Sequence, residues 1–307
     1  MLDECEKFKG IVVAIKANYL IVEIDSSWLK VSQLKNKREH SFRLLCTLRK
    51  KLLHQGFSVH VGDDVFVESI NWSLGHGVIS KLEPRKSCLT RPPIANATEF
   101  IVVLSLKDPV FDYNQASRFL LTAEQSGLKV SLILTKLDLI SSNEVSEKIQ
   151  YLTAWGYKPT AVSIKNGKGI DAFLQQIRLS KLAVLCGPSG TGKSSLLNHI
   201  MCQELITIGS LSTKLKRGKN TTRHVQLYSL AENTLVADTP GFNRPEIKIE
   251  PVKLQTLFPE IRSQIKDCRC KFRDCLHRDE PGCVVDKSWQ RYSEYRKLLD
   301  EMINSHR

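Results

Sequence analysis

The sequence predicts a multidomain protein: a β-barrel over residues 1–84, an α/β domain over residues 85–245 and a helical module over residues 246–307. Three observations lead to this division. The first part holds several short apolar runs and no long helical pattern. Strand and helix patterns alternate in the second part, whereas the third is polar, helical and rich in cysteine. The linker between the first two parts is bracketed by Pro84, Pro92 and Pro93.

Length, composition and charge restrict the class of protein before any motif is considered. The 307 residues, 42% of them hydrophobic, suffice for more than one globular core. The sequence has no apolar run long enough to cross a membrane, and residues 1–10 lack an apolar signal core. We therefore expect a cytoplasmic protein without membrane contact, and a monomer because no oligomerisation surface is evident. The net charge of +13 favours a polyanionic partner such as RNA.

The first part is expected to be a five-stranded barrel of the oligonucleotide-binding (OB) fold. Ala17 and Asn18 suit a hairpin turn. Four of the strands are predicted at residues 11–15, 19–24, 42–48 and 65–70. Eight Lys or Arg and one acid, Glu39, lie between Lys30 and Lys51. This basic stretch is either a solvated loop or a surface that contacts phosphates.

The second part is expected to be a mostly parallel sheet with helices on both faces, because strands and helices alternate. Its strands are predicted at residues 100–106, 130–134, 160–163, 182–186, 225–230 and 234–237. Its helices are predicted at residues 113–126, 143–155, 169–179 and 193–200. In the third part, a helix at residues 288–304 places Trp289, Tyr292, Arg296 and Leu299 on one packed face.

A glycine-rich stretch between a predicted strand and a predicted helix has the context that a phosphate loop (P-loop) requires. Backbone N–H groups of such a loop surround the phosphates of a nucleotide. Lys193 is expected to reach the β- and γ-phosphates as a catalytic group, and Ser194 to bind Mg²⁺. The alternative is a chance glycine-rich turn. The stretch consists of Gly187, Pro188, Ser189, Gly190, Thr191, Gly192, Lys193 and Ser194, and the adjoining Ser195 is assigned to the same site.

A guanine-recognition motif, Thr135-Lys136-Leu137-Asp138, follows the strand predicted at residues 130–134. The Asp138 carboxylate can accept hydrogen bonds from guanine N1–H and N2–H. Adenine offers no such pair, which argues against an ATPase. Lys136 would lay its methylenes along the base, and Thr135 stands where most GTPases carry Asn. Ser163 belongs to a loop that resembles the one whose backbone N–H contacts guanine O6.

A sensor motif for magnesium and the γ-phosphate begins at Asp238, where Asp238 would hold a magnesium-bound water and the Gly241 N–H would detect the γ-phosphate. Either Thr221 or Thr222, in a basic stretch upstream, is expected to complete the Mg²⁺ shell when GTP is bound, and we favour Thr222. Phe242 stands where many GTPases place a water-orienting Gln, so slow intrinsic hydrolysis is expected.

The order of these motifs is permuted. An ordinary GTPase has the P-loop first, then the sensor and then the guanine motif. Here the guanine motif at Asp138 precedes the P-loop lysine at Lys193, which precedes the sensor at Asp238. The sequence therefore predicts a circularly permuted P-loop GTPase domain that binds GTP or GDP with Mg²⁺.

A cysteine cluster near the C-terminus has the pattern Cys-x4-Cys-x-His-x5-Cys, made by Cys270, Cys275, His277 and Cys283. Three thiolates and one imidazole are a complete tetrahedral ligand set, so one structural Zn²⁺ is expected. A reducing cytoplasm favours metal ligands over disulfides. The alternatives are buried cysteines beside a surface histidine, or Cys268 in place of Cys270.

These features together resemble the ribosome small-subunit-dependent GTPase A family, RsgA or YjeQ, over essentially the whole chain. The resemblance implies a cytoplasmic GTPase that binds the small (30S) ribosomal subunit late in its maturation. The subunit would stimulate hydrolysis, and the barrel and zinc module would contact its rRNA. The family often has a catalytic His before the paired threonines, where this chain has Asn220. His224 is a substitute for that His or a surface residue on a strand.

Two other functions are kept open. One is an RNA-binding protein whose GTP site is static or hydrolyses slowly, an interpretation that Asn220 and Phe242 leave room for. The other is a permuted GTPase with a different RNA target. Intact Lys193, Ser194 and Asp238 favour hydrolysis, and a zinc motif placed after the GTPase domain favours the ribosomal target.

Overall fold

The computed structural model describes residues 6–305 except for residues 17–18, 26–41, 55, 57, 208–224, 231–233 and 239–244. Contacts divide the chain into two compact units. The first combines residues 1–99, 174–185 and 194–242, and the second combines residues 100–173, 186–193 and 243–307. Each unit draws on separate stretches of the chain, so the three predicted domains stay a prediction. None of the described helices is long and apolar enough to cross a membrane.

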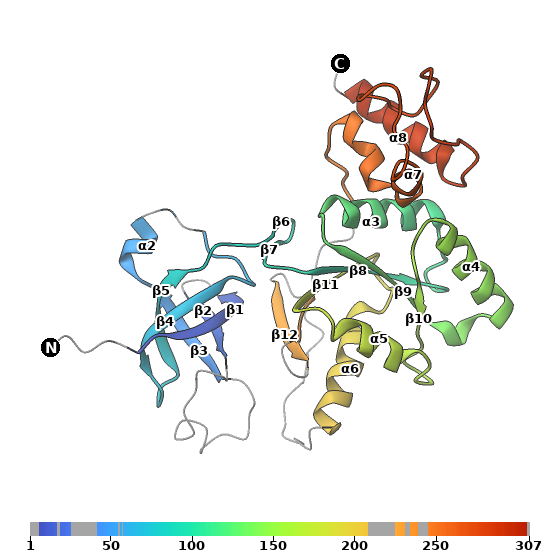
Figure 1. The fold of residues 1–307 in the computed structure, drawn as a ribbon. Helices are drawn as coiled ribbons and strands as arrows, with labels where there is room; N and C mark the ends of the chain where they lie inside the picture. Colours follow the sequence, from blue (N-terminus) through green and yellow to red (C-terminus); the bar gives the residue numbers. More distant parts are fainter. Residues whose placement is uncertain are drawn as a thin grey trace. The chain divides into compact units, whose positions relative to one another are not determined.

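Five strands of the first unit close into the predicted barrel (Figure 1). They are β1 (Phe8–Lys16), β2 (Tyr19–Ile24), β3 (Phe42–Leu48), β4 (Asp64–Asn71) and β5 (His76–Leu82). β1 pairs with β2 and β4, while β3 pairs with β2 and β5, and β4 pairs with β5. The ring has no open edge, and alternate residues such as Val12, Val22 and Val67 fill its core.

The fifth strand is the one that the sequence pattern did not reveal. On β5 the inward positions are Gly77 and Ile79, so a glycine interrupts the alternation of apolar and polar residues. A Cβ atom at position 77 would lie 2.6 Å from Val67 Cγ1, which explains why a glycine stands there. The barrel is followed by a short hairpin of β6 (Cys88–Thr90) and β7 (Pro93–Ala95). α2 (Lys50–His54) lies between β3 and β4.

Three further strands of the first unit continue from β1. β12 (Gln226–Leu230) pairs antiparallel with β1 and with β13 (Thr234–Asp238). β13 runs parallel to β11 (Leu182–Cys186). The helix predicted after the P-loop is α6 (Lys193–Thr207), which begins at the expected residue and continues beyond the expected end.

The second unit contains β8 (Glu99–Ser105), β9 (Lys129–Thr135) and β10 (Thr160–Ala161), in the order β10-β9-β8. Every residue of β8 is buried, as expected of a strand covered on both faces. Its helices are α3 (Tyr113–Gln125) and α4 (Ser142–Ala154), with the 3₁₀ turn η2 (Leu137–Leu139). α5 (Ile170–Ile177) begins in this unit, and its residues from Leu174 onward are assigned to the first. Side chains cap two of them: Asp112 accepts from the first turn of α3, and Ser141 forms a capping box with Glu144 on α4.

The C-terminal module also belongs to the second unit. It consists of η3 (Pro251–Leu257), α7 (Pro259–Gln264), the cysteine-rich loop and α8 (Tyr292–Ser305). The predicted packed face of the last helix needs correction at Arg296, which is only half-buried and is not a member of the apolar cluster. Trp289, Tyr292 and Leu299 pack in that cluster as predicted, together with Tyr295 and Leu298. These side chains pack against η3, α7 and Leu121 of α3.

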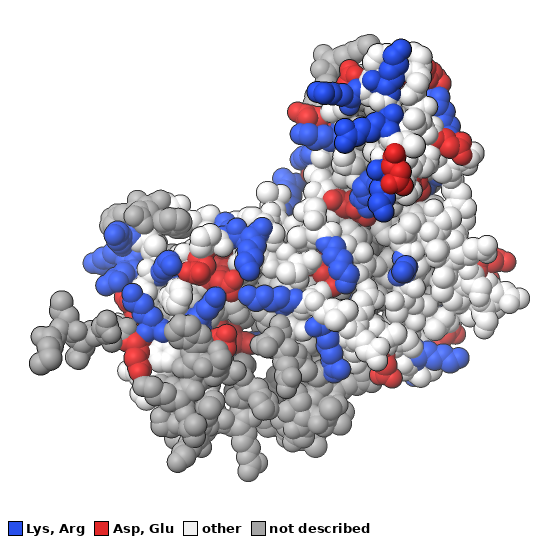
Figure 2. All heavy atoms as spheres, in the orientation of Figure 1, with Lys and Arg blue, Asp and Glu red and all other residues white. Residues whose placement is uncertain are grey.

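Lysine and arginine side chains are spread over the barrel and the C-terminal module on the face drawn in Figure 2, with acids among them. Most of the basic stretch between Lys30 and Lys51 lies outside the described residues. Within the described part, Arg43 pairs with Glu23 at 2.9 Å and Arg49 pairs with Glu68 at 2.9 Å.

Candidate nucleotide site and metal centre

The P-loop begins where β11 ends. Gly187 has a φ of +138°, and a Cβ atom there would lie 2.1 Å from the carbonyl oxygen of Val103. Only glycine lets the loop leave the strand so close to the neighbouring backbone. α6 begins at Lys193, so the loop ends at a helix N-terminus, which favours bound anions.

The side chains of the loop hold its shape. Lys193 Nζ donates to the carbonyl oxygens of Gly187 and Pro188, at 2.8 and 2.7 Å. Thr191 is 1% exposed, and its hydroxyl donates to Pro188 O at 3.0 Å. The Thr191 side chain therefore supports the loop from within, and contact with a phosphate is left to its backbone.

The structure brings together the two residues expected nearest the magnesium ion. Ser194 Oγ donates to Asp238 Oδ2 at 3.0 Å. Asp238 is the last residue of β13 and is buried, opposite Leu185 of β11 in the parallel register. The hydroxyl lies in the first turn of α6 and the carboxylate at the end of β13, and both are hard oxygen donors, which suits Mg²⁺.

The guanine motif is tied to the P-loop by hydrogen bonds. Thr135 Oγ1 lies 2.6 Å from Thr191 O and 3.2 Å from Leu104 O, and Thr135 is buried. Lys136 Nζ donates to Gly190 O at 2.9 Å and also to Asp108 O. Although Thr135 departs from the usual Asn, its hydroxyl thus joins the motif to the loop.

Asp138 is oriented by Ser163. Ser163 Oγ donates to Asp138 Oδ1 at 2.6 Å, and this bond is the main reason that the pKa of Asp138 lies below its usual value. The Asp138 carboxylate therefore stays ionised and able to accept hydrogen bonds. The N–H of Ser163 itself donates to Lys168 O at 2.9 Å, whereas its side chain contacts Asp138.

Several expected site residues lie outside the described part of the chain: Asn220, Thr221, Thr222, His224, Gly241 and Phe242. Their roles in completing the Mg²⁺ shell, detecting the γ-phosphate and assisting hydrolysis stay predictions.

The four predicted zinc ligands come together. The ligand atoms of Cys270, Cys275, His277 and Cys283 all lie within 4.8 Å of one another. His277 Nδ1 lies 3.6 Å from the Sγ atoms of Cys270 and Cys275 and 3.4 Å from that of Cys283. Ligand atoms around a tetrahedral zinc are about 3.5–3.8 Å apart, given Zn–S bonds of about 2.3 Å. The cluster is therefore compatible with zinc, while Cys268 is exposed and is not among its members.

The protonation chemistry also fits a cation. Burial lowers the pKa of His277, which keeps its imidazole neutral as a metal ligand must be. Burial raises the pKa of the Cys275 thiol to about 12, so this thiol would lose its proton at neutral pH only with a cation bound beside it.

The residues that contact this centre were not predicted as its partners, although Tyr292 was placed on the packed face of the last helix. Gln255 Oε1 lies 2.6 Å from His277 Nε2. The Tyr292 and Tyr295 hydroxyls donate to the carbonyl oxygens of His277 and Leu276, at 3.0 and 2.8 Å. The two tyrosines follow the motif on α8, but the sequence spacing between Gln255 and His277 carries no signal.

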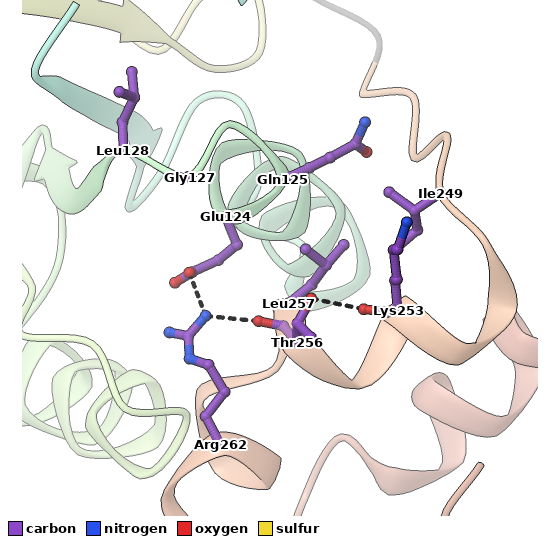
Figure 3. A pocket seen from close by; sticks show the side chains of 9 residues that line it. All are labelled: Glu124, Gln125, Gly127, Leu128, Ile249, Lys253, Thr256, Leu257 and Arg262. Atoms are coloured by element: carbon purple, nitrogen blue, oxygen red, sulfur yellow. Dashed lines mark hydrogen bonds and ion pairs between the residues drawn. The ribbon is translucent and has the colours of Figure 1, made fainter. Parts of the chain in front are cut away.

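A pocket of about 490 Å³ lies elsewhere in the second unit, between the end of α3 and the segment of η3 and α7 (Figure 3). Glu124 and Arg262 form an ion pair at 2.6 Å across it, and Arg262 also donates to Thr256 O at 2.9 Å. Beside it, the Gln125 amide exchanges two hydrogen bonds with the backbone of Lys248. None of the expected nucleotide or metal residues lines this pocket.

Comparison with known proteins identifies the family. A family profile described as RsgA GTPase matches residues 82–248. A relative from a strain of Prochlorococcus marinus is 52% identical, over 98% of this chain and 98% of its own, and is named small ribosomal subunit biogenesis GTPase RsgA. The chain belongs to the RsgA GTPase family. A relative of the same name from a strain of Synechococcus is 50% identical over 96% of this chain and 94% of its own.

Two solved structures agree with this fold along nearly the whole chain. YjeQ from Thermotoga maritima has a TM-score of 0.77 and 31% identity, covering 97% of this chain and 99% of that chain. YloQ, described as a circularly permuted GTPase, has a TM-score of 0.74 and 26% identity, covering 99% and 98%. The expected family, the permuted GTPase domain and GTP hydrolysis are thereby confirmed.

Proposed function

We propose that this GTPase binds the small (30S) ribosomal subunit, acts in its late maturation, and hydrolyses GTP faster when bound to it. The observation that carries the proposal is the near full-length match, at 52% identity, to a protein named for small-subunit biogenesis. The barrel and the C-terminal module accompany the GTPase domain here, so the parts that would dock on RNA are present. This role places the protein in the cytoplasm, and we expect it to act as a monomer.

For the nucleotide, we propose that Asp138 accepts from guanine N1–H and N2–H while Lys136 lies along the base. Ser163 would hold Asp138 in position, and a backbone N–H of its loop would contact guanine O6. Lys193 and the backbone from Gly187 onward would hold the phosphates. Their positions at the helix N-terminus and at the end of β9 support this assignment.

For magnesium, we propose ligation by Ser194 and Thr222, with Asp238 acting through a bound water. The ion would neutralise charge that develops on the phosphate oxygens. The contact between Ser194 and Asp238 supports the first part of this site. Thr221 is the alternative to Thr222, Gly241 would detect the γ-phosphate, and Asn220 and His224 are the candidates for assisting hydrolysis.

For zinc, we propose one structural ion bound by Cys270, Cys275, His277 and Cys283. A closed set of four protein ligands leaves no position for a substrate, so the ion would stabilise the loop of the module. We further propose that this module and the barrel contact rRNA, in keeping with a net charge of +13.

The test is GTP hydrolysis by the purified protein with and without isolated small subunits, with ATP as the control nucleotide. We expect strong stimulation by the subunits with GTP alone. We also expect tighter subunit binding with a non-hydrolysable GTP analogue than with GDP. Turnover that is unchanged by subunits would reject the proposal and favour an RNA-binding role with slow hydrolysis.

The guanine assignment predicts the outcome of Asp138→Asn. Loss of a charge-assisted acceptor should weaken GTP binding by about 10- to 100-fold. Xanthosine triphosphate should bind better to the variant than to the unmodified protein, because the Asn amide can donate to the C2 carbonyl of xanthine. Competition with a fluorescent nucleotide measures both affinities. Asp171→Asn, an exposed acid on α5, is the matched control, and unchanged GTP affinity in Asp138→Asn would refute the assignment.

A further inference from the structure

The imidazole of His277 is used at both nitrogens. Nδ1 faces the three sulfur atoms of the cluster, at 3.4–3.6 Å. Nε2 lies 2.6 Å from Gln255 Oε1, in a different element, η3. A neutral imidazole carries one proton, so a metal at Nδ1 requires that proton on Nε2.

The orientation of the Gln255 amide follows from its second contact. Gln255 Nε2 donates to Val252 O at 2.8 Å within η3. A carbonyl oxygen can only accept, so the nitrogen must be on that side and Oε1 must be on the side of His277. Gln255 therefore offers the imidazole an acceptor, and the Nε2–H of His277 is the donor.

The backbone around His277 is held independently of Gln255. His277 has a φ of +55°, which few residues other than glycine adopt. The Glu280 carboxylate accepts from Leu276 N at 3.1 Å and Arg278 N at 2.8 Å, and Tyr292 donates to His277 O. With the backbone of His277 held by these contacts, only the side-chain torsion angles of His277 are left to set the direction of its ring. Among the described residues, Gln255 is the hydrogen-bond partner of His277 Nε2.

We propose that Gln255 is a positioning residue for the zinc centre: its amide oxygen fixes the tautomer and the rotation of His277, so that Nδ1 points at the metal. This inference rests on the zinc site proposed above. An acceptor bound to the second nitrogen of a ligating histidine raises the basicity of the imidazole. It also orients the ring before the metal binds, so that less rotational freedom is lost on binding. The same hydrogen bond connects the cysteine-rich loop to η3.

Zinc affinity of the full chain, measured by competition with a chromogenic chelator, tests the proposal. Gln255→Leu removes the acceptor and should raise the zinc dissociation constant by about 10- to 100-fold. Gln255→Glu keeps an acceptor and should recover most of this loss. Gln264→Leu is the matched control, because Gln264 lies in the same module and accepts from the backbone N–H of Asp286 instead. Its zinc affinity should equal that of the unmodified protein.

The tautomer is tested separately, by nitrogen-15 NMR of the zinc-loaded, histidine-labelled protein without any substitution. We expect the proton of His277 on Nε2 and the metal on Nδ1. A proton on Nδ1, or equal zinc affinity in Gln255→Leu and Gln264→Leu, would overturn the proposal. Failure of the unmodified protein to bind one zinc would instead reject the metal site itself, so the two outcomes can be told apart.

Discussion

Lys193→Ala is expected to lower the single-turnover rate of GTP hydrolysis by about 100- to 1000-fold, the usual cost of removing one hydrogen-bond donor that stabilises charge in a transition state. Lys193 opens α6, and its ammonium lies 2.8 Å from Gly187 O and 2.7 Å from Pro188 O. Bound phosphates would offer this ammonium stronger, charged acceptors than the two carbonyls. The rate is measured under single-turnover conditions, with enzyme in excess over GTP and at a saturating concentration, so that the chemical step is observed separately from binding.

The matched control is Lys181→Ala, which removes an exposed lysine that pairs with Asp64 at 3.4 Å. We expect its hydrolysis rate to stay within about threefold of that of the unmodified protein, because an exposed ion pair contributes little to the stability of the fold. If Lys193→Ala hydrolysed GTP as fast as this control, Lys193 would have no part in catalysis. The site would then be better described as a static nucleotide site.

Arg291→Met is expected to lower the free energy of unfolding of the second unit by about 3–5 kcal/mol, because it leaves a buried carboxylate without its partner. The Arg291 guanidinium forms two hydrogen bonds with Glu260, at 2.7 and 2.6 Å, and the two side chains are only 2% and 6% exposed. It also donates to Ser117 Oγ at 3.1 Å and lies over the ring of Trp155, 4.4 Å from its centroid. Urea unfolding followed by tryptophan fluorescence measures the loss.

Two further variants separate the charge from the packing. Arg118→Met removes an exposed ion pair between Arg118 on α3 and Glu301 on α8. It should lower the free energy of unfolding by less than about 1 kcal/mol. The double variant Arg291→Met with Glu260→Leu removes both charges and should regain much of the stability. If the double variant were as unstable as the sum of its single variants, lost packing rather than the unpaired charge would explain the effect.

Much of the candidate site could be predicted because its parts are local. The P-loop from Gly187 to Ser194 needs only a strand, a glycine-rich loop and a helix in succession. The zinc ligands lie between Cys270 and Cys283, so one loop can bring them together. β5 was harder to predict, because Gly77 stands at an inward position where an apolar side chain is expected and so interrupts the alternation of apolar and polar residues.

The sequence by itself determined most of the longer strands and helices, the permuted order of the motifs and the types of ligand atoms, because backbone propensity and side-chain chemistry depend on neighbouring residues. Only the tertiary structure decided which distant groups meet. It placed Thr135 against Thr191, Ser163 against Asp138 and Gln255 against His277. Such contacts depend on how separate strands and helices pack. A buried polar group forms a hydrogen bond with whichever partner the packing brings near it, and the spacing of the two residues in the sequence does not predict that partner.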